Sequence, residues 1–338
     1  MNKPPPKAEP LTAARLFQMV RGGAVVQVLS VACKLELAET LRERPRTIAE
    51  LAELKHAHAP TLGRVVRALV ALGVFAEDAQ GRLTVTQGGQ LLDGRAAGSL
   101  KGVLLLAGAG FHWAAWGALF PAVLDGKAPF EHAHGKSLYD WLPGRGDEAQ
   151  LLFTPPREHL AQVMPIVLAS FDFTKFPTIV DVGGGAGVFL AAVLRACPDV
   201  RGVLVDQPEI LAQARAITDD PAIAARCTLT PGSFFERVPT GGDLYVLTTV
   251  LMDWDDAAAT QILKNVRAAM APTARLLVVE QLDGPSIETR MADLDMLVFS
   301  PSGRLRSEAE FHALFQAAGL TPVRTLRSPS GALLEAAP

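Results

Sequence analysis

Cysteine, tyrosine and charged side chains are all scarce in this chain of 338 residues. It contains 3 cysteines, 2 tyrosines and 20% charged residues. Cys33, Cys197 and Cys227 are odd in number and form no Cys-x-x-Cys pair, which argues against a disulfide framework and a structural zinc site. We therefore expect a reducing, cytoplasmic location. Because the sequence has no cluster with metal-ligand spacing, we also expect no bound metal.

Neither sign of charge dominates the sequence. There are 32 basic and 35 acidic side chains, which give a net charge of −3. A protein that wraps nucleic acid would carry a strong basic excess, so the composition speaks against a nucleic-acid partner. Apolar residues make up 49% of the chain, enough for a sizeable core, and the length suggests two domains.

Only one long stretch, residues 102–124, lacks a formally charged side chain. It is interrupted by Gly108, Gly110, His112 and Pro121, so we expect buried helices and no membrane span. Residues 1–11 are rich in proline and lack an apolar run. They are expected to form a disordered leader and neither a signal peptide nor an anchor.

Residues 12–100 have the element order of a winged helix. Apolar spacing predicts a helix from Thr12 to about Cys33 and a short second helix up to Leu41. The segments TIAELAEL and HAPTLGRVVRALVALGVF then predict two helices, with Thr47 and Thr61 as their N-caps, and RLTVTQ predicts a strand.

A winged helix commonly binds DNA through its second helix, which here carries Arg64 and Arg67. Against this function stand 13 basic and 9 acidic residues within positions 1–100, where DNA contact favours a contiguous basic face. The apolar stretch from Gly22 to Cys33 exceeds what one helix face should expose. It favours a module buried against a second copy of the chain, a homodimer.

Residues 101–170 are expected to be a helical linker that contributes to a substrate pocket. Pro155 and Pro156 should break or start a helix there. Aromatic rings in the linker suit either core packing or an aromatic ligand. They are Phe111, Trp113, Trp116, Phe120, Phe130, Tyr139, Trp141 and Phe153.

Strand and helix patterns alternate over residues 171–338, which predicts an α/β domain with a parallel sheet and helices on both faces. The segments are TIVDV, FLAAVLRAC, GVLVD, EILAQARAI, LYVLTTVL, AAATQILKNVRAAM and ARLLVVEQL.

A glycine loop follows the first of these strands. Gly183, Gly185 and Gly187 stand between TIVDV and a helix, where the backbone can approach a ligand and helix N–H groups can face it. The spacing differs from a dinucleotide fingerprint, because Val188 occupies the position of its last glycine. Asp206 ends the next strand, where a carboxylate can accept hydrogen bonds from both ribose hydroxyls of an adenosine.

Several segments together resemble one family: DVGGGAG, VDQPEIL, GSFFERVP, LTTVLMDWDD and RLLVVEQL. They are similar to the S-adenosylmethionine-dependent methyltransferases that act on small aromatic molecules, of the caffeic acid, hydroxyindole and antibiotic-tailoring types. The resemblance covers nearly the whole chain, including HWAAWG and FEHAHG in the linker. It implies a Rossmann-like class I methyltransferase domain at residues 171–338, preceded by a winged-helix, mostly α-helical dimerisation domain.

The resemblance also implies roles for individual residues around S-adenosyl-L-methionine. The glycines would lie under its methionine and ribose parts, Asp206 would hold the ribose hydroxyls, and the remaining residues would surround the adenine. The implied cofactor-binding set is Gly183, Gly185, Gly187, Asp206, Gln207, Ser233, Phe234 and Trp254. Ser233 stands where the family usually has Asp, and Phe234 and Trp254 could equally be plain core residues.

The family's general base is a histidine after the fourth strand, and here that position is Met252. A thioether cannot accept a proton at any useful pH. Glu280 matches the carboxylate that orients this histidine, although a capped or solvated carboxylate would explain it as well. His112, His132 and His134 in the linker are alternative bases, and His112 is the one we assign provisionally to the catalytic set.

Other departures also fall around the pocket. The linker reads TPPR at 154–157, where the family continues a helix, and Thr248 and Thr249 occupy a region that often carries Lys or Arg. Asp253 and Asp255 are expected at the start of the next helix, where negative charge is favourable.

The sequence therefore predicts an S-adenosylmethionine-dependent methyltransferase of secondary metabolism. Its substrate would be an aromatic or polyketide-like small molecule whose nucleophile needs no histidine base: an acidic phenol, an amine or an electron-rich ring carbon. The alternative is an enzyme of this fold that retains the cofactor for hydroxylation, decarboxylation or cyclisation, in which a sulfonium stabilises developing negative charge.

Overall fold

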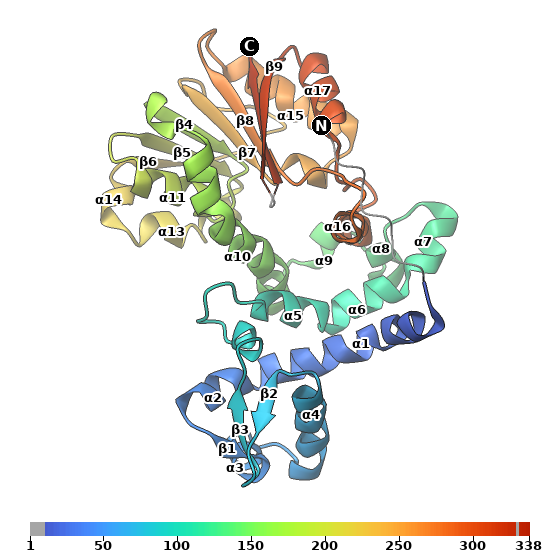
Figure 1. Ribbon diagram of the computed structural model, residues 1–338. Helices are drawn as coiled ribbons and strands as arrows, with labels where there is room; N and C mark the ends of the chain where they lie inside the picture. The colour runs from blue at the N-terminus through green and yellow to red at the C-terminus, as the bar shows by residue number, and fades with distance from the viewer. Residues whose placement is uncertain (1–10, 329–330) are drawn as a thin grey trace. The chain divides into compact units, whose positions relative to one another are not determined.

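A computed structural model describes residues 11–328 and 331–338, which divide into two compact units (Figure 1). Unit 1 holds the described residues up to Ala118 together with Ala133–Glu158, and unit 2 holds Leu119–His132 and His159–Pro338. The expected leader falls outside the described residues, except for Leu11. The domain boundaries at 12, 101 and 171 stay predictions.

The first part of unit 1 has the winged-helix order that the sequence predicts. Its small antiparallel sheet has the order β1-β3-β2. Thr12 is the N-cap of α1. Thr47 and Glu50 form a reciprocal capping box at α3, which confirms the prediction that Thr47 is the N-cap of this helix. The elements are α1 (Ala13–Lys34), α2 (Leu37–Glu43), β1 (Arg46–Thr47), α3 (Ile48–Leu54), α4 (Ala59–Ala71), β2 (Phe75–Glu77), β3 (Arg82–Val85) and η1 (Gly89–Leu92).

The expected cap at Thr61 is wrong. Helix α4 begins at Ala59 with His58 as its N-cap, and Thr61 lies inside the first turn, with its Oγ1 2.8 Å from His58 Nδ1. Pro60 accounts for the earlier start, because its fixed φ suits the first turn of a helix and its missing N–H needs no partner there.

The uncharged stretch forms short helices, many of whose apolar side chains are exposed. These are α5 (Lys101–Ala107), α6 (Gly110–Gly117) and α7 (Leu119–Asp125), followed by α8 (Pro129–His134) and α9 (Leu138–Trp141). Phe111 is buried, but Trp113 is 45% and Phe120 75% exposed. The expectation of buried helices is thus only partly correct, since helices of about two turns that pack on one side leave their other side exposed.

Helix α1 has the most exposed apolar surface of unit 1. Within residues 11–328 and 331–338 it is the helix that is long and apolar enough to cross a membrane, with 17% of its most apolar window buried. Phe17 is 61% and Val20 72% exposed. A core helix of a monomer would bury these side chains, so α1 needs a partner surface.

Helix α10 (Gly146–Ser170) runs through Pro155 and Pro156 without a break, which corrects the expectation of an interruption. Two adjacent prolines remove two backbone donors, but their φ is compatible with a helix and the ladder resumes after them. Just before them, Thr154 Oγ1 donates to the Gln150 carbonyl at 2.7 Å.

Unit 2 contains a seven-stranded sheet of order β6-β5-β4-β7-β8-β10-β9. Strands β4 to β8 are parallel, and β10 is antiparallel to both of its neighbours. The strands are β4 (Thr178–Val182), β5 (Arg201–Asp206), β6 (Cys227–Pro231), β7 (Leu244–Thr248), β8 (Arg275–Glu280), β9 (Thr321–Ser328) and β10 (Gly331–Ala337).

Helices cover both faces of this sheet, as the alternating pattern predicts (Figure 1). Val180 and Val182 of β4 face a core shared with α15 and α17, whereas Ile179 packs into a core with α10 and α11. The helices and turns of unit 2 beyond α10 are η2 (Phe173–Lys175), α11 (Val188–Ala196), α12 (Pro208–Leu211), α13 (Arg215–Thr218), α14 (Pro221–Ala224), η3 (Leu251–Asp253), α15 (Asp256–Ala269), α16 (Ile287–Phe299) and α17 (Glu308–Ala317).

The sheet domain differs from the predicted pattern at several elements, and β6, α16 and α17 correspond to none of the predicted segments. EILAQARAI is not one helix but α12 and α13, because Leu211 and Ile217 both enter the same core and would point about 120° apart on a continuous helix. The antiparallel pair β9 and β10 was not predicted. It covers the edge of β8 that a purely parallel sheet would leave open.

Candidate active site

The candidate site residues gather at the carboxyl ends of the parallel strands. From β4 the chain proceeds to β5 and β6 on one side, and β7 and β8 lie on the other. In such sheets, ligands bind in a crevice at the point where the strand order reverses, which here is at the ends of β4 and β7. Gly183, Asp206 and Met252 follow or end β4, β5 and β7, and Glu280 ends β8.

The glycine loop lines this crevice. Gly183, Gly185 and Gly187 all have positive φ, and Gly187 is the left-handed N-cap of α11. At Gly185 an added Cβ would meet nothing within 4 Å, whereas at Gly183 it would lie 3.0 Å from Val250. The loop is therefore tightly packed on one side and open at Gly185, which forms a cradle beside the first N–H groups of α11.

Asp206 is held beside the loop by two backbone donors. The Gly185 N–H donates to its Oδ2 at 2.8 Å and the Gln207 N–H to its Oδ1 at 2.7 Å. Burial raises the pKa of this carboxyl, while the two N–H groups oppose the shift. The side chain is half-buried, so its remaining lone pairs can accept further hydrogen bonds from a ligand.

Asp181 is a carboxyl that the sequence analysis did not include. It is fully buried in β4, and an added Cβ on Gly184 would lie 2.4 Å from its Oδ2. Neither oxygen makes a well-formed hydrogen bond with the described residues. Burial, with repulsion from Asp206, raises its pKa to about 7 against a smaller opposing effect of the Leu190 N–H. An acidic residue inside an otherwise apolar buried strand was the available signal.

Ser233, Phe234 and Trp254 belong to one cluster next to the loop. The rings of Phe234 and Phe235 lie 6.1 and 4.7 Å from that of Trp254, both edge-on, and Phe234 Cε1 would be 3.2 Å from a Cβ on Gly183. Ser233 Oγ accepts from the Phe235 N–H at 3.3 Å. The cluster is half-buried, so both packing and ligand contact are compatible with it.

Met252 lies in the turn η3 with its main chain bonded on both sides. Glu280 Oε1 accepts from the Leu251 N–H at 2.9 Å and the Met252 N–H at 3.3 Å, and the Met252 carbonyl accepts from the Arg304 N–H at 2.9 Å. Glu280 is 2% exposed, and burial and repulsion from Asp253 raise its pKa to about 8. Its geometry is that of a buried cap on the turn.

Arg306 binds the carbonyl groups of the same turn, and no sequence pattern indicates this role. The guanidinium donates to the carbonyls of Leu251 and Trp254, each at 2.6 Å, and its Nε donates to Asp256 Oδ1 at 2.9 Å. The side chain is 1% exposed. An arginine in RLRS, two residues after another arginine, does not differ in pattern from a surface residue.

Asp253 does not belong to the following helix, which corrects the expectation. It ends η3, whereas Asp255 is the N-cap of α15 and its Oδ1 accepts from the Ala258 N–H at 2.8 Å. Trp254 lies between them with an extended backbone, in which its carbonyl accepts a hydrogen bond from Arg306. Burial raises the pKa of Asp253 to about 7.

Thr248 and Thr249 lead into this turn. Thr248 is buried, and Thr249 has φ 52°, an uncommon conformation for a β-branched residue. The Thr249 N–H donates to the Val279 carbonyl at 3.0 Å. Backbone strain of this kind persists only where surrounding contacts enforce it, and it clusters at functional sites.

The three linker histidines are all engaged with neighbours. His112 Nε2 accepts from the Trp116 indole at 3.2 Å, and burial lowers the pKa of this histidine. His134 Nε2 lies 2.9 Å from the Phe111 carbonyl, and His132 Nε2 lies 3.0 Å from Asp125 Oδ1. His112 and His134 belong to unit 1 and Met252 to unit 2, so a role for either as base stays a prediction.

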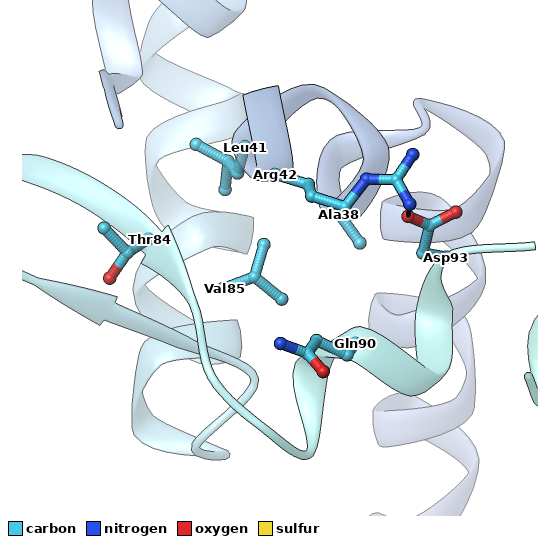
Figure 2. Close-up of a pocket in the computed structure, with 7 residues that line it drawn as sticks. All are labelled: Ala38, Leu41, Arg42, Thr84, Val85, Gln90 and Asp93. Carbon is cyan, nitrogen blue, oxygen red and sulfur yellow. Dashed lines mark ion pairs between the residues drawn. The ribbon is translucent and has the colours of Figure 1, made fainter. Parts of the chain in front are cut away.

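Unit 1 has two cavities of its own. One of about 220 Å³ lies in the winged-helix module, where Arg42 pairs with the buried Asp93 at 2.9 Å beside Val85 and Gln90 (Figure 2). The other, of about 460 Å³, is lined by residues of α5 and α10 that include Thr154 and Glu158. Thr154 of the TPPR segment, where the sequence departs from the family, thus borders a cavity, although helix α10 continues through this segment.

No cluster of three or more His, Cys, Asp or Glu side chains suited to a metal occurs within residues 11–328 and 331–338.

Comparison with known proteins agrees with this geometry. An O-methyltransferase domain family matches residues 116–321, and an O-methyltransferase dimerisation domain matches residues 17–92. The chain belongs to the O-methyltransferase family. It is therefore an S-adenosylmethionine-dependent methyltransferase, with a Rossmann-like sheet domain and a helical N-terminal dimerisation domain, as the resemblance implied.

Three relatives illustrate the range of the family. Phenazine O-methyltransferase PhzM of Lysobacter antibioticus is 35% identical, over 98% of this chain and 97% of its own. The 8-amino-8-demethylriboflavin N,N-dimethyltransferase of Streptomyces davaonensis is 35% identical over 94% and 93%. The crystal structure of NcsB1 from neocarzinostatin biosynthesis, in complex with S-adenosylmethionine and 2-hydroxy-5-methyl naphthoic acid, is similar with a TM-score of 0.80, 30% identity, and coverage of 93% and 96%.

The raised pKa of Asp181 predicts a falling stability with rising pH. The unfolded chain ionises this carboxyl near pH 4, whereas the folded protein keeps its proton up to about pH 7. The folded state thus binds more protons, and the free energy of unfolding should fall between these values by up to about 1.4 kcal/mol per pH unit. Asp181→Asn should reduce that slope in urea denaturation series.

Glu310→Gln is the control for this measurement. Arg304 and Ser307 lower the pKa of Glu310 to about 2, so its stabilising effect is complete above pH 5 and constant between pH 5 and 7, where the Asp181 slope is compared. An unchanged slope between pH 5 and 7 in Asp181→Asn would contradict the assigned protonation of Asp181.

Proposed function

We propose that this methyltransferase acts on an aromatic small molecule of secondary metabolism, at a nucleophile that is reactive near neutral pH without a histidine base. The observation that carries the proposal is Met252 on an otherwise complete turn: its main chain is bound by Glu280 and Arg304, yet its side chain cannot take a proton. Relatives named for O-methylation and for N,N-dimethylation support both an acidic phenol and an amine as acceptor.

The crevice fits S-adenosylmethionine, which supplies an electrophilic methyl group on a sulfonium sulfur. Gly185 leaves open space beside the α11 N-terminus, and Asp206 offers lone pairs at the end of β5. Phe234 and Trp254 provide flat apolar surface beside the loop for an adenine.

Methyl transfer in this site would depend on alignment and not on proton removal. In-line displacement gains most from holding the reacting atoms in line and excluding water. Met252 contributes a half-buried apolar side chain where a base would stand. Glu280 is a poor substitute, because Oε1 already accepts two backbone N–H groups and the carboxyl is 2% exposed.

Cofactor binding should depend on Asp206 and not on a metal. Removing the carboxylate in Asp206→Ala deletes charge-assisted hydrogen bonds, each of which is worth about 1.5–3 kcal/mol, so affinity should fall at least about tenfold. Calorimetry with S-adenosylhomocysteine, with and without a chelator, measures this.

Asp243→Ala is the matched control. Its carboxylate also accepts a backbone N–H, from Thr178 at 2.9 Å, but at the amino end of β4. It should leave the affinity unchanged. Equal affinity in wild type and Asp206→Ala would remove Asp206 from the site, and loss of binding in the chelator would contradict the metal-free assignment.

Restoring the histidine should restore the missing chemistry. A general base typically contributes about 10² to 10⁴ in rate, so Met252→His should methylate a simple phenol of high pKa faster than wild type, with the gain reduced in Met252→His combined with Glu280→Gln. Following S-adenosylhomocysteine and product mass together measures transfer.

Two results would oppose this reading of position 252. A wild-type rate on that phenol equal to the rate of Met252→His would mean that the base is not missing. A product formed without consumption of cofactor would instead support the non-methylating alternative.

We further propose a homodimer assembled through α1. Phe17 and Val20 are exposed apolar residues within the matched dimerisation domain, so Phe17→Glu combined with Val20→Glu should place charge in the interface and halve the mass measured by light scattering. Val323→Glu, at a 50% exposed position of β9, is the control and should stay dimeric. A monomeric wild type at micromolar concentration would contradict the proposal.

A further inference from the structure

Arg306 is the largest fully buried side chain of the described residues, and all of its hydrogen bonds go to one segment. Nη1 donates to the Leu251 carbonyl, Nη2 to the Trp254 carbonyl, and Nε to Asp256. A guanidinium withdrawn from water is tolerated only when its donors are paired. Its planar fork can bridge two carbonyls at once, which an ammonium group cannot do in the same geometry.

The two carbonyls that Arg306 holds belong to the first residue of the turn and to the residue that follows it. Met252 lies between them, and the Trp254 carbonyl fixes the extended backbone from which the indole projects. The indole meets Phe235 at 4.7 Å and Phe234 at 6.1 Å, and Phe234 packs against Gly183. A continuous line of contacts therefore runs from Arg306 through Trp254 and Phe234 to the glycine loop.

The opposite side of the turn is held by Glu280. Its Oε1 accepts from the N–H groups of Leu251 and Met252, so the carboxyl binds N–H groups and the guanidinium binds carbonyls of the same turn, with Leu251 bound by both. Asp256 also balances the charge of Arg306, with Arg304 at 3.0 Å from both of its oxygens. Loss of Arg306 would leave the buried Leu251 carbonyl and the partly buried Trp254 carbonyl without their donor and free the Trp254 end of the turn.

We propose that Arg306 is a positioning residue for the cofactor pocket: it acts through the Leu251 and Trp254 carbonyls to hold the aromatic wall against the glycine loop. This inference rests on the proposed assignment of the crevice to the cofactor. It adds a residue that contacts neither cofactor nor substrate and yet sets the affinity for the cofactor.

A second arginine of the same domain provides a matched comparison. Arg226 donates to the carbonyls of Leu194, Cys197 and Val200 at 2.7, 3.1 and 2.8 Å. It thus makes the same kind of main-chain contacts, but where α11 ends and β5 begins. This is the amino end of β5, whereas Asp206 lies at its carboxyl end. Loss of Arg226 should lower stability without affecting the pocket.

The test compares Arg306→Ala, Arg306→Lys and Arg226→Ala by thermal denaturation and by calorimetry with S-adenosylhomocysteine. We expect both alanine variants to lose stability, but only Arg306→Ala to lose affinity, by more than tenfold. Guanidinium ion at about 20 mM should restore at least a third of the affinity that Arg306→Ala loses, measured on a logarithmic scale. The reason is that removal of the Arg306 side chain leaves a cavity of the shape of a guanidinium ion. Arg226→Ala should show no such rescue. Arg306→Lys should fold and bind with an intermediate affinity.

Three results would overturn the inference. The first is an affinity for S-adenosylhomocysteine within twofold of wild type in Arg306→Lys and in any folded Arg306→Ala. The second is a loss of affinity in Arg226→Ala equal to that in Arg306→Ala. The third is a loss of affinity in Arg306→Ala that guanidinium leaves unchanged. A wild-type protein that binds no S-adenosylhomocysteine would contradict the proposed cofactor site itself, and this inference with it. Normal binding of S-adenosylhomocysteine by the wild type, with unchanged affinity in the Arg306 variants, would contradict this inference but leave the proposed cofactor site standing.

Discussion

The turn from Leu251 to Trp254, held by the buried carboxyl of Glu280 and the buried guanidinium of Arg306, is the constraint on which the rest of the site depends. Glu280 binds the N–H groups of Leu251 and Met252, and Arg306 binds the carbonyls of Leu251 and Trp254. Burying a carboxyl and a guanidinium is unfavourable unless their hydrogen bonds are made, so the turn and its two anchors form as one unit. The turn fixes where residue 252 stands and how the aromatic wall meets the glycine loop.

This arrangement separates the placement of a catalytic side chain from its chemistry. The main chain at Met252 is bound independently of the side chain, so exchanging a base for a thioether leaves the scaffold intact. Proximity and orientation can supply much of the rate of a displacement, whereas a general base adds a smaller factor that matters mainly for weakly acidic nucleophiles. A site without a base is then suited to acceptors that are already nucleophilic.

Much of this organisation could be predicted from the sequence. The apolar periodicity placed four of the five parallel strands, but not β6, and TIVDVGGGAG with Asp206 pointed to the carboxyl ends of β4 and β5. Local sequence rules failed where tertiary contacts decided the structure. Asp253 lies in a turn whose carbonyls are bound by Arg306, and not in the next helix. Helix α10 continues through two prolines, and the strands β9 and β10 were not predicted. Asp181 and Arg306 went unrecognised because their significance lies in burial and in distant partners, which spacing along the chain does not encode. The roles of the predicted site residues stay predictions.

The most direct test of the central claim is the pH dependence of single-turnover methyl transfer at saturating S-adenosylmethionine, with an aromatic amine that the enzyme methylates. If the site works by alignment alone, the rate should follow only the ionisation of the amine itself and be level at all pH values above its pKa. An additional ionisation of the enzyme between pH 6 and 9 that is abolished in a variant of a linker histidine would contradict the account, because it would reveal a protein base at work.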